Sequence, residues 1–510
     1  MRSDESRRRF GAQTGKSIRC LERRWAPLAL IVVAGHCYRG PPSPPPNEPL
    51  VSAEYEVTDA GLGHRMVATP NPETTNVARV GSSLYFVYRH RASSSGGPTF
   101  LRRFDLVTRS FDPAVLIDDL GEAGSSTYHT EPSVLRDRSG ALIAFIQHAQ
   151  QPELCDGRDS TAPRIRRLPD PRNPRTWHEA TCLPVRAGVG LGAPGNRPWL
   201  YDVSGDFDDH SGVTHFVGEG AGLTQMDGKA GGGLPRTYYR ILPDGRFDGP
   251  YTLIEAAGHQ PPEFPPGGNV FAKGDIALGQ EPSGPRSLHV VWTVRNTFQD
   301  AQGVHQWNYN LYHAVSRDGG ETWAPANGSV VIPLREHIQW NDSRFLVAAG
   351  DIDQNSPRAF SVDASGNPVL LVMTRRSCTG ASYGGRADLM RSPSPTFDLR
   401  FLHWNGAAWV GGVIDDSRDY FEARPGFRIA PDGAWWLFLG DPMRYRVSRD
   451  QGATWSDPAT FGADAGDGWR PWSYPDPVGA HAHYIVYQKR SSGRLYFVRF
   501  RLDRASGAGR

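Results

Sequence analysis

The sequence predicts an all-β protein, a β-propeller built from four-stranded blades. A turn with the pattern S-x-D-x-G-x-T-W occurs twice, at residues 316–323 and 448–455. Short apolar strands recur between turns rich in Asp and Gly, as expected for blades. The 57 glycines, 42 prolines and 14 tryptophans suit tight turns and aromatic packing, and no long amphipathic helix pattern follows residue 50. These observations together favour a propeller with seven blades.

Length and charge narrow the classes of function. The chain has 510 residues, with 56 basic and 54 acidic side chains. Because these charges nearly balance, we expect no nucleic-acid partner bound by bulk charge. We divide the chain into a leader over residues 1–36, a Pro-rich tether over 37–50 and a single propeller domain over 51–505. We expect a monomer.

The N-terminal segment predicts export. An Arg-rich stretch precedes the apolar run from Trp25 to Gly35, which is short for a membrane span and suits the apolar region of a signal peptide. Cys37 follows, so the segment resembles a bacterial lipoprotein signal, although His36 stands where a small residue is usual. The alternatives are plain secretion, or a basic leader that results from a misassigned start codon. We expect an exported protein, secreted or held at the cell envelope by a lipid on Cys37.

The remaining cysteines give one candidate disulfide. Cys155 and Cys182 flank a polar, Pro-rich segment and could pair in an oxidising compartment, while Cys378 is left over. No C-x-x-C or H-x-x-x-H spacing indicates a zinc site. We therefore predict no cofactor, with a structural cation such as calcium left open.

Seven units of similar internal order fit the chain after residue 76, and six or eight blades remain alternatives. Each unit has a strand, an Asp-Gly turn, a stronger apolar strand, a loop and an outer strand. The strong strands are 83–88, 141–146, 213–217, 288–293, 369–373, 435–438 and 483–487. The Asp-Gly turns are clearest at 137–140, 363–366 and 431–433.

The repeated turn motif indicates architecture rather than chemistry. Its Ser and Asp side chains can bond backbone N–H groups inside a turn, and its Gly supplies a positive φ. Trp323 and Trp455 would then fold back over their hairpins. The motif resembles the Asp-box, or bacterial neuraminidase repeat, which lies at a strand-to-strand turn of a propeller blade. The resemblance places it away from the usual propeller active site.

Two histidines are predicted to share one rim. His129 precedes the strand 131–135, and His148 ends the next strand, after the turn 137–140. Adjacent antiparallel strands bring the start of the first beside the end of the second. His129 and His148 should therefore lie at the end of the hairpin away from the turn. The alternative is that both are ordinary solvated histidines at strand ends.

Residues from about 125 to 410 resemble the BNR-4 family of neuraminidase-repeat proteins. The shared features are an H-x-x-P strand at His129, a D-x-x-G turn and a strand closing in His148. A W-x-x-R strand at 292–295, an Asn-bearing strand at 308–312 and an Asp-box complete the match. Some relatives are polysaccharide lyases of the ulvan-lyase kind, with seven blades and two rim histidines. The resemblance implies that His129 and His148 correspond to those two.

Such lyases also need a Tyr for proton transfer and an Arg that neutralises the uronate carboxylate. The nearest matches in the following unit are Arg197 and Tyr201, whereas Gly218-Glu219 stands where an arginine is expected. β-Elimination requires a neutralised carboxylate, because only then is the proton α to it acidic enough to remove. Arg295, Arg197 or Arg424 could supply that charge from another blade.

Two alternatives use the same fold. A non-catalytic propeller could bind glycans or proteins by stacking aromatic side chains on sugar rings, the candidates being Trp199, Trp292, Trp307, Trp472 and Tyr474. For Trp292 we favour packing between blades. A sialidase-like hydrolase is the second alternative, and residues 427–431 resemble its F-R-I-P signature. That signature belongs in a first blade and here falls in the sixth, so we interpret it as coincidence.

Overall fold

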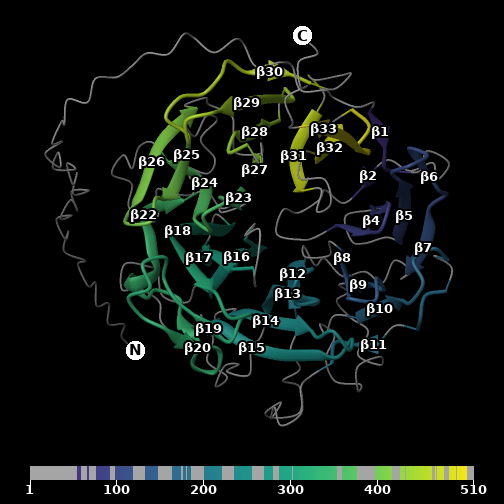
Figure 1. Cartoon of the computed structure of the whole chain (residues 1–510), viewed down its shortest axis with the longest axis horizontal. Coiled ribbons are helices and arrows are strands. Elements are labelled where there is room, and N and C mark those ends of the chain that lie inside the picture. Colours follow the sequence, from purple (N-terminus) through teal and green to yellow (C-terminus); the bar gives the residue numbers. More distant parts are fainter. Residues whose placement is uncertain are drawn as a thin grey trace, which may run out of the picture.

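The computed structural model is an all-β propeller whose seven blades surround a central axis (Figure 1). It describes residues 54–58, 66–67, 76–91, 98–118, 132–146, 164–173, 176–179, 181–184, 200–220, 235–255, 269–279, 286–300, 303–352, 359–375, 397–415, 425–430, 432–440, 442–461, 466, 468–475, 482–489 and 491–501. The leader, the tether and Cys37 lie outside these residues. In the described part of the chain, no helix has the length and apolar character needed to cross a bilayer.

The blades follow one another in chain order. Blade 1 comprises β3 (Val77–Val80), β4 (Ser83–Arg91), β5 (Thr99–Asp105), β6 (Ser110–Phe111) and β7 (Val115–Asp118), with β2 (Met66–Val67) beside β4. Blade 2 comprises β8 (Ser133–Arg136), β9 (Leu142–Ile146), β10 (Arg164–Leu168) and β11 (Thr181–Cys182). Blade 3 comprises β12 (Leu200–Asp208), β13 (Val213–Gly220), β14 (Arg236–Ile241) and β15 (Phe247–Glu255), and β21 (Ile338–Gln339) runs parallel to β15.

Blade 4 is built on the longest hairpin. It comprises β16 (Asn269–Leu278), β17 (Leu288–Asp300), β18 (Gly303–Ser316) and β22 (Leu346–Ile352). Its outer segment adds β19 (Thr322–Trp323), β20 (Ile332–Pro333) and the 3-10 turns η3 (Leu334–Glu336) and η4 (Ser343–Phe345). Blade 5 comprises β23 (Ala359–Val362), β24 (Pro368–Arg375), β25 (Phe397–Trp404) and β26 (Trp409–Asp415).

The last two blades close the ring. Blade 6 comprises β27 (Gly426–Ile429), β28 (Trp435–Leu439), β29 (Arg444–Ser448) and β30 (Ala459–Thr460). Blade 7 comprises β31 (Gly468–Pro475), β32 (Ala482–Lys489), β33 (Leu495–Arg501) and β1 (Tyr55–Glu56).

The N-terminal strand β1 supplies the outermost strand of blade 7. Tyr55 stands opposite Phe497, and their rings stack with centroids 5.1 Å apart. Two ion pairs fasten the same segment, Lys489 to Glu54 at 2.9 Å and Arg494 to Glu56 at 3.0 Å. The start of the folded chain thus closes the ring against its end.

The hydrophobic core is divided among the interfaces between blades. One buried cluster lies between each neighbouring pair, and one of them joins blade 7 to blade 1. Strand β28 shows how the sequence produces this arrangement. Trp435 and Leu437 pack toward blade 5, whereas Trp436 and Phe438 pack toward blade 7, because successive side chains of a strand point to opposite faces. Strand β28 is therefore apolar throughout.

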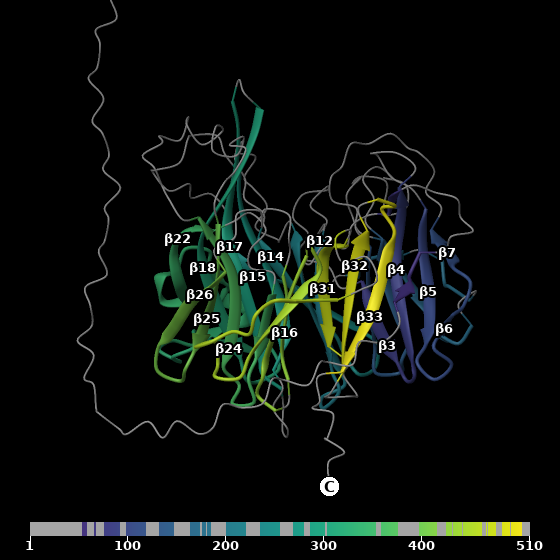
Figure 2. The same ribbon diagram turned by 90° about the horizontal axis from the view of Figure 1, so that it is seen from above.

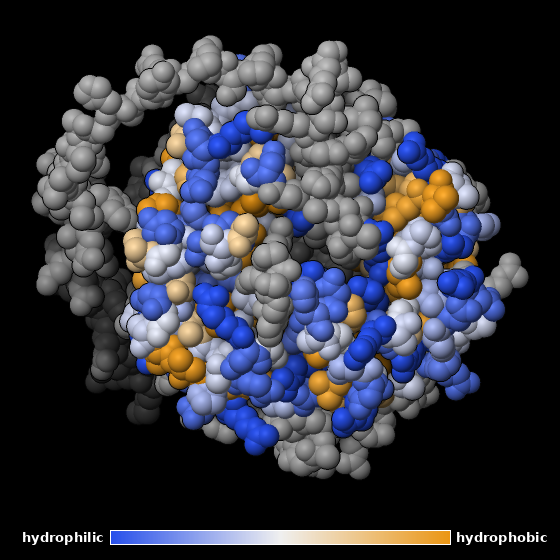
Figure 3. All heavy atoms as spheres, in the orientation of Figure 1, coloured by the Kyte–Doolittle hydropathy of each residue, from blue (hydrophilic) through white to orange (hydrophobic). Residues whose placement is uncertain are grey.

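The propeller has two different rims (Figure 2). We call the end that carries the turns 316–323 and 448–455 the Asp-box rim, and the opposite end the loop rim. The register places Leu288, at the start of β17, opposite Ser316, so the turns between first and second strands share the Asp-box rim. Strands β17 and β18 remain paired out to Asp300 and Gly303 and project from the loop rim in Figure 2. On the face drawn in Figure 3, polar and apolar described residues are interspersed.

Candidate functional site

The structure places two of the five predicted site residues on the loop rim, by their backbone. Tyr201 lies near the start of β12 and pairs with Glu219, while Arg295 lies on β17 between Phe271 and Asn308. His129, His148 and Arg197 lie outside the described residues, as does Arg424. Their predicted roles therefore stay predictions.

The hairpin that connects the two predicted histidines is present. β8 and β9 are antiparallel, with Ser133 opposite Phe145 and Arg136 opposite Leu142. The Asp-Gly turn between them is held by Asp137, which accepts a 3.0 Å hydrogen bond from the Ala141 N–H and bonds Arg167. The predicted strands and turn are confirmed, which is the part of the argument that rests on described residues.

Blade 3 carries two buried charged residues, Glu219 and Arg236, at the loop rim that the sequence did not reveal. Tyr201, Glu219 and Arg236 are consecutive register partners across β12, β13 and β14. Glu219 is 2% exposed and Arg236 is fully buried. Arg236 Nη2 donates to the Gly274 carbonyl on β16 and so links blade 3 to blade 4.

An arginine was expected on the second strand, where Glu219 stands; the third strand supplies one instead. Residues 221–235 separate the two strands, so sequence spacing alone could not bring Arg236 opposite Glu219. Glu219 and Arg236 therefore place opposite charges in the interior of blade 3 next to the loop rim.

Other ionisable groups are buried near the same rim. Arg89, near the end of β4, is fully buried, and Lys489, at the end of β32, is 7% exposed and paired with Glu54. Buried charges are retained where partners compensate them, since desolvation is otherwise unfavourable. Second strands of several blades thus end in charged side chains close to the loop rim.

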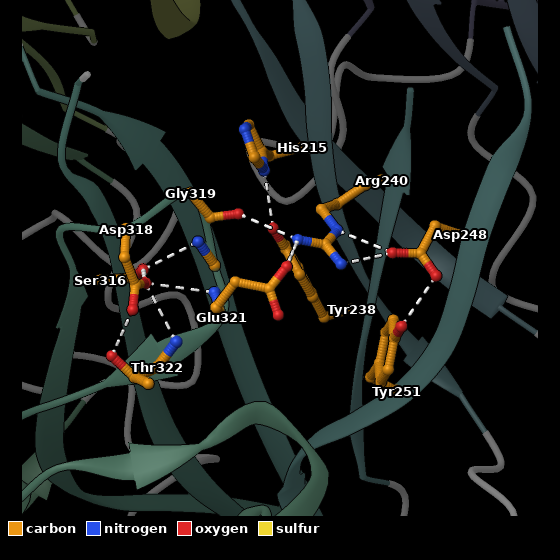
Figure 4. A network of polar contacts seen from close by, with 11 residues as sticks. His215, Tyr238, Arg240, Asp248, Tyr251, Ser316, Asp318, Gly319, Glu321 and Thr322 are labelled. Atoms are coloured by element: carbon orange, nitrogen blue, oxygen red, sulfur yellow. Dashed lines mark hydrogen bonds and ion pairs between the residues drawn. The ribbon is translucent and has the colours of Figure 1, made fainter. Parts of the chain in front are cut away.

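The Asp-box rim carries a different network, which joins blade 3 to blade 4 (Figure 4). Arg240 on β14 bonds Asp248 through Nε at 2.9 Å and also bonds Glu321 of the first Asp-box. Asp248 accepts a 2.7 Å hydrogen bond from the Tyr251 hydroxyl. Each of these side chains has a partner within the protein, so the network links blade 3 to blade 4.

The interior end of that network contains His215 and Tyr238. His215 Nδ1 lies 2.6 Å from the Tyr238 hydroxyl, and both side chains are buried. Burial lowers the pKa of His215 to about 4 and raises that of Tyr238. A methyl group added at Gly320 would lie 2.2 Å from the Tyr238 hydroxyl, which explains the glycine at this point of the turn. Both groups are neutral at pH 7 and closed off by protein.

A second histidine pair lies inside blade 4. His289 Nδ1 is 3.0 Å from His313 Nε2, and His289 Nε2 is 2.7 Å from the Ser287 hydroxyl. The two rings are 1% exposed, and His313 packs edge-on against Trp409 of blade 5. Burial holds the pKa of His289 well below its usual value and lowers that of His313 to about 3. The pair is neutral and internal.

The aromatic candidates for sugar stacking divide in two. Trp292 is fully buried in the apolar cluster that blades 3 and 4 share, so the predicted packing between blades is confirmed. Trp199 lies outside the described residues, and Trp307, Trp472 and Tyr474 are placed by their backbone alone. These four stay predictions.

One cysteine of the predicted disulfide pair lies among the described residues. Cys182 on β11 is disulfide-bonded, and Cys155 lies outside the described residues. No group of three His, Cys, Asp or Glu side chains in the described ranges is arranged to hold a metal ion. A structural cation stays an open prediction.

Comparison with known proteins finds solved structures of low similarity to this chain. No family model matches the chain, and no curated protein matches it. A Hadza microbial sialidase, Hz136, is similar over 85% of this chain and 75% of its own, at 14% identity and a TM-score of 0.39. A protein of unknown function from Dyadobacter fermentans covers 74% of this chain and 95% of its own, at 12% identity and a TM-score of 0.36.

A third similar structure is the β-propeller domain of the trilobed protease from Pyrococcus furiosus. It covers 87% of this chain and 99% of its own, at 10% identity and a TM-score of 0.37. All three TM-scores lie below 0.5, so these likenesses carry no information about the activity of this chain.

Proposed function

We propose that this propeller is an exported carbohydrate-active protein that acts at its loop rim on glycans containing uronic acids, by β-elimination. The observation that carries the proposal is the antiparallel β8–β9 hairpin. His129 and His148 were predicted to share one rim because they flank such a hairpin. The backbone positions of Tyr201 and Arg295 on the same rim support it.

The chemistry assigns one task to each residue. A neutral imidazole of His129 or His148 removes or relays the proton α to the uronate carboxylate, and Tyr201 transfers a proton to the leaving oxygen. Arg295, with Arg197 as the second choice, neutralises the carboxylate so that the enolate-like state is stabilised. The bond between the ring carbon and the glycosidic oxygen breaks, which leaves an unsaturated uronate on one product.

The deciding experiment follows absorbance near 235 nm while the full chain is incubated with a panel of polyuronides. We expect a steady rise with at least one substrate, and a rate that increases with pH through the histidine pKa of about 6.5. His129→Ala and His148→Ala should each lower the rate on the order of 100-fold or more. His178→Ala, an exposed histidine between β10 and β11, is the matched control and should change nothing.

The two alternatives give different outcomes. A non-catalytic glycan binder would bind polysaccharide without any absorbance change, and the histidine substitutions would shift affinity modestly. A sialidase-like hydrolase would release a sugar without an unsaturated product. Either result would overturn the lyase proposal.

A further inference from the structure

The outer wall of the propeller carries a groove between blades 1 and 2. It has a volume of about 600 Å³ and is lined by residues 112–116 of blade 1, by Arg166 on β10 and by Trp177. Strand β7, which contains part of the first wall, lies at the outer side of the ring in Figure 1. The groove has the size of an ordinary ligand site and is separate from Tyr201 and Arg295, which lie on blades 3 and 4.

The surrounding strands hold both walls of the groove in place. On blade 1, β7 pairs with β5 and places Val115 opposite Leu101. On blade 2, the segment that carries Trp177 is held against β10 by a 2.9 Å hydrogen bond from the His178 N–H to the Arg167 carbonyl. Trp177 is partly buried and packs against the apolar cluster that joins blades 1 and 2. The indole is thus anchored on one side while it lines the groove.

Two side chains of opposite charge line the same groove. The Arg166 side chain is 29% exposed, and its Nη2 lies 3.9 Å from Asp118 Oδ1, which is too long for a hydrogen bond. The Asp112 side chain is 44% exposed, and its Oδ2 accepts a 3.1 Å hydrogen bond from Arg103. The groove therefore presents a guanidinium donor and a carboxylate acceptor beside an aromatic ring, and the charges of its lining balance.

Arg166 and Trp177 also carry hydrogen-bond donors that the described residues leave unused. The Arg166 Nε–H and the Trp177 Nε1–H are buried and have no acceptor in that part of the chain. Buried polar groups are normally hydrogen-bonded, because desolvation without a partner is unfavourable. A hydroxyl oxygen that enters the groove supplies an acceptor after a small movement of either side chain. These unused donors are a second observation that points to a ligand.

We propose that this groove binds a sugar ring of a polysaccharide through its hydroxyl groups. Trp177 stacks on the ring, Arg166 donates to hydroxyl oxygens, and the Asp112 carboxylate accepts from a hydroxyl. Because one arginine and one aspartate balance in the lining, the groove favours hydroxyl groups, which both donate and accept, over an ionic ligand. An added peptide strand fits less well, since Pro113 in the wall has no N–H to donate.

The groove rests on the proposed function for the choice of a glycan as ligand, and it adds a site that holds the polymer without cleaving it. The test is isothermal titration calorimetry on the full chain carrying His129→Ala, a change expected to prevent turnover. The probes are cello-, xylo- and galacto-oligosaccharides, oligogalacturonate and the methyl ester of oligogalacturonate. We expect saturable binding of at least one probe. Heat that saturates with none of them would overturn the proposal.

Four variants assign the binding to the groove. Trp177→Ala and Arg166→Ala should each weaken it by about tenfold or more, the effect of losing a stacking ring or a charged donor. Trp177→Phe keeps an aromatic ring and should restore most of the affinity. Arg246→Ala is the control, because that side chain is 74% exposed and pairs with Asp244 on blade 3. If Trp177→Ala fails to fold, as judged by circular dichroism, Arg166→Ala decides, and unchanged affinity in that folded variant would refute the site.

The component of binding that Trp177→Ala removes should not depend on charge. It should be the same in about 0.05 and 0.5 M NaCl, and the methyl ester should bind in the groove no more weakly than the acid. A component that requires the acid form and falls steeply with salt would overturn recognition through hydroxyl groups. The lyase activity is scored separately, because Trp177→Ala should keep the parent kcat on short polyuronides. Saturable groove binding in a chain that never produces an unsaturated uronate would refute the lyase proposal alone.

Discussion

The two Asp-box turns share three hydrogen bonds to the Asp side chain and have different surroundings. In the first, Asp318 accepts from the Ser316 hydroxyl at 2.8 Å, the Thr322 N–H at 3.0 Å and the Thr322 hydroxyl at 2.6 Å. In the second, Asp450 accepts the corresponding three bonds at 2.9, 2.8 and 2.6 Å. Because every one of these bonds spans four residues or fewer, the turn is encoded locally.

The contacts beyond the turns differ. Trp323 is 1% exposed and packs edge-on against Tyr238 of blade 3, whereas Trp455 is only partly buried. Glu321 of the first turn bonds Arg240, and Ala453 holds the same place in the second. A shared local motif thus serves two different blade interfaces, and the differences should be measurable as stability.

Lowering the pH should produce the largest difference in stability between blade 4, which carries the first turn, and blade 6, which carries the second. Blade 4 contains the buried pair His289 and His313, and blade 6 contains no histidine. Their pKa values are lowered in the folded protein, so the unfolded chain binds more protons below its histidine pKa of about 6.5. Stability is then complete above pH 6.5 and is lost as pH falls from there toward about 3.

From pH 7 to pH 5 we expect a loss of about 2 kcal/mol per buried histidine. Urea unfolding at each pH measures the total, and amide exchange at residues 311–316 and 444–448 compares the blades. His289→Gln should flatten the pH dependence, while His210→Gln, at an exposed position, should leave it unchanged. Equal acid sensitivity of the two segments would contradict the assignment to blade 4.

Loss of the turn aspartates should have an intermediate effect that is alike in both turns. Asp318→Ala and Asp450→Ala each leave backbone N–H groups and a Thr hydroxyl without an acceptor, at a cost of about 1–3 kcal/mol. Asp→Asn keeps one acceptor oxygen and should cost less. Glycan affinity should not change in either variant. A lost affinity at an unaltered melting temperature would show that the motif serves binding instead.

Local turns could be predicted from the sequence, whereas contacts between residues distant in the sequence could not. The turns at Asp137 and Asp318 were predicted because their acceptors and donors are four residues apart or fewer. The two-residue strand β1 carries no pattern of its own, so its place beside β33 was not predicted. Arg236 was not predicted, because residues 221–235 separate its strand from that of Glu219, its register partner.

The smallest difference between the turns should be the ion pair of the first. Glu321 is 62% exposed, so its bond to Arg240 contributes at most about 1 kcal/mol and weakens with salt. Glu321→Ala, which reproduces the second turn, should therefore lower the free energy of unfolding by less than that, and less still in 1 M salt. The reverse change, Ala453→Glu, should stay within about 0.5 kcal/mol of the parent.

A double-mutant cycle with Arg240→Gln isolates the pair from the bond between Arg240 and Asp248, since that bond is lost equally in both arms of the cycle. We expect a coupling energy below about 1 kcal/mol that falls with salt. A coupling several times larger and independent of salt would mean that Glu321 is held in a desolvated clamp. In that case the first Asp-box would be an obligatory part of the interface between blades 3 and 4, and the second would not be its equivalent.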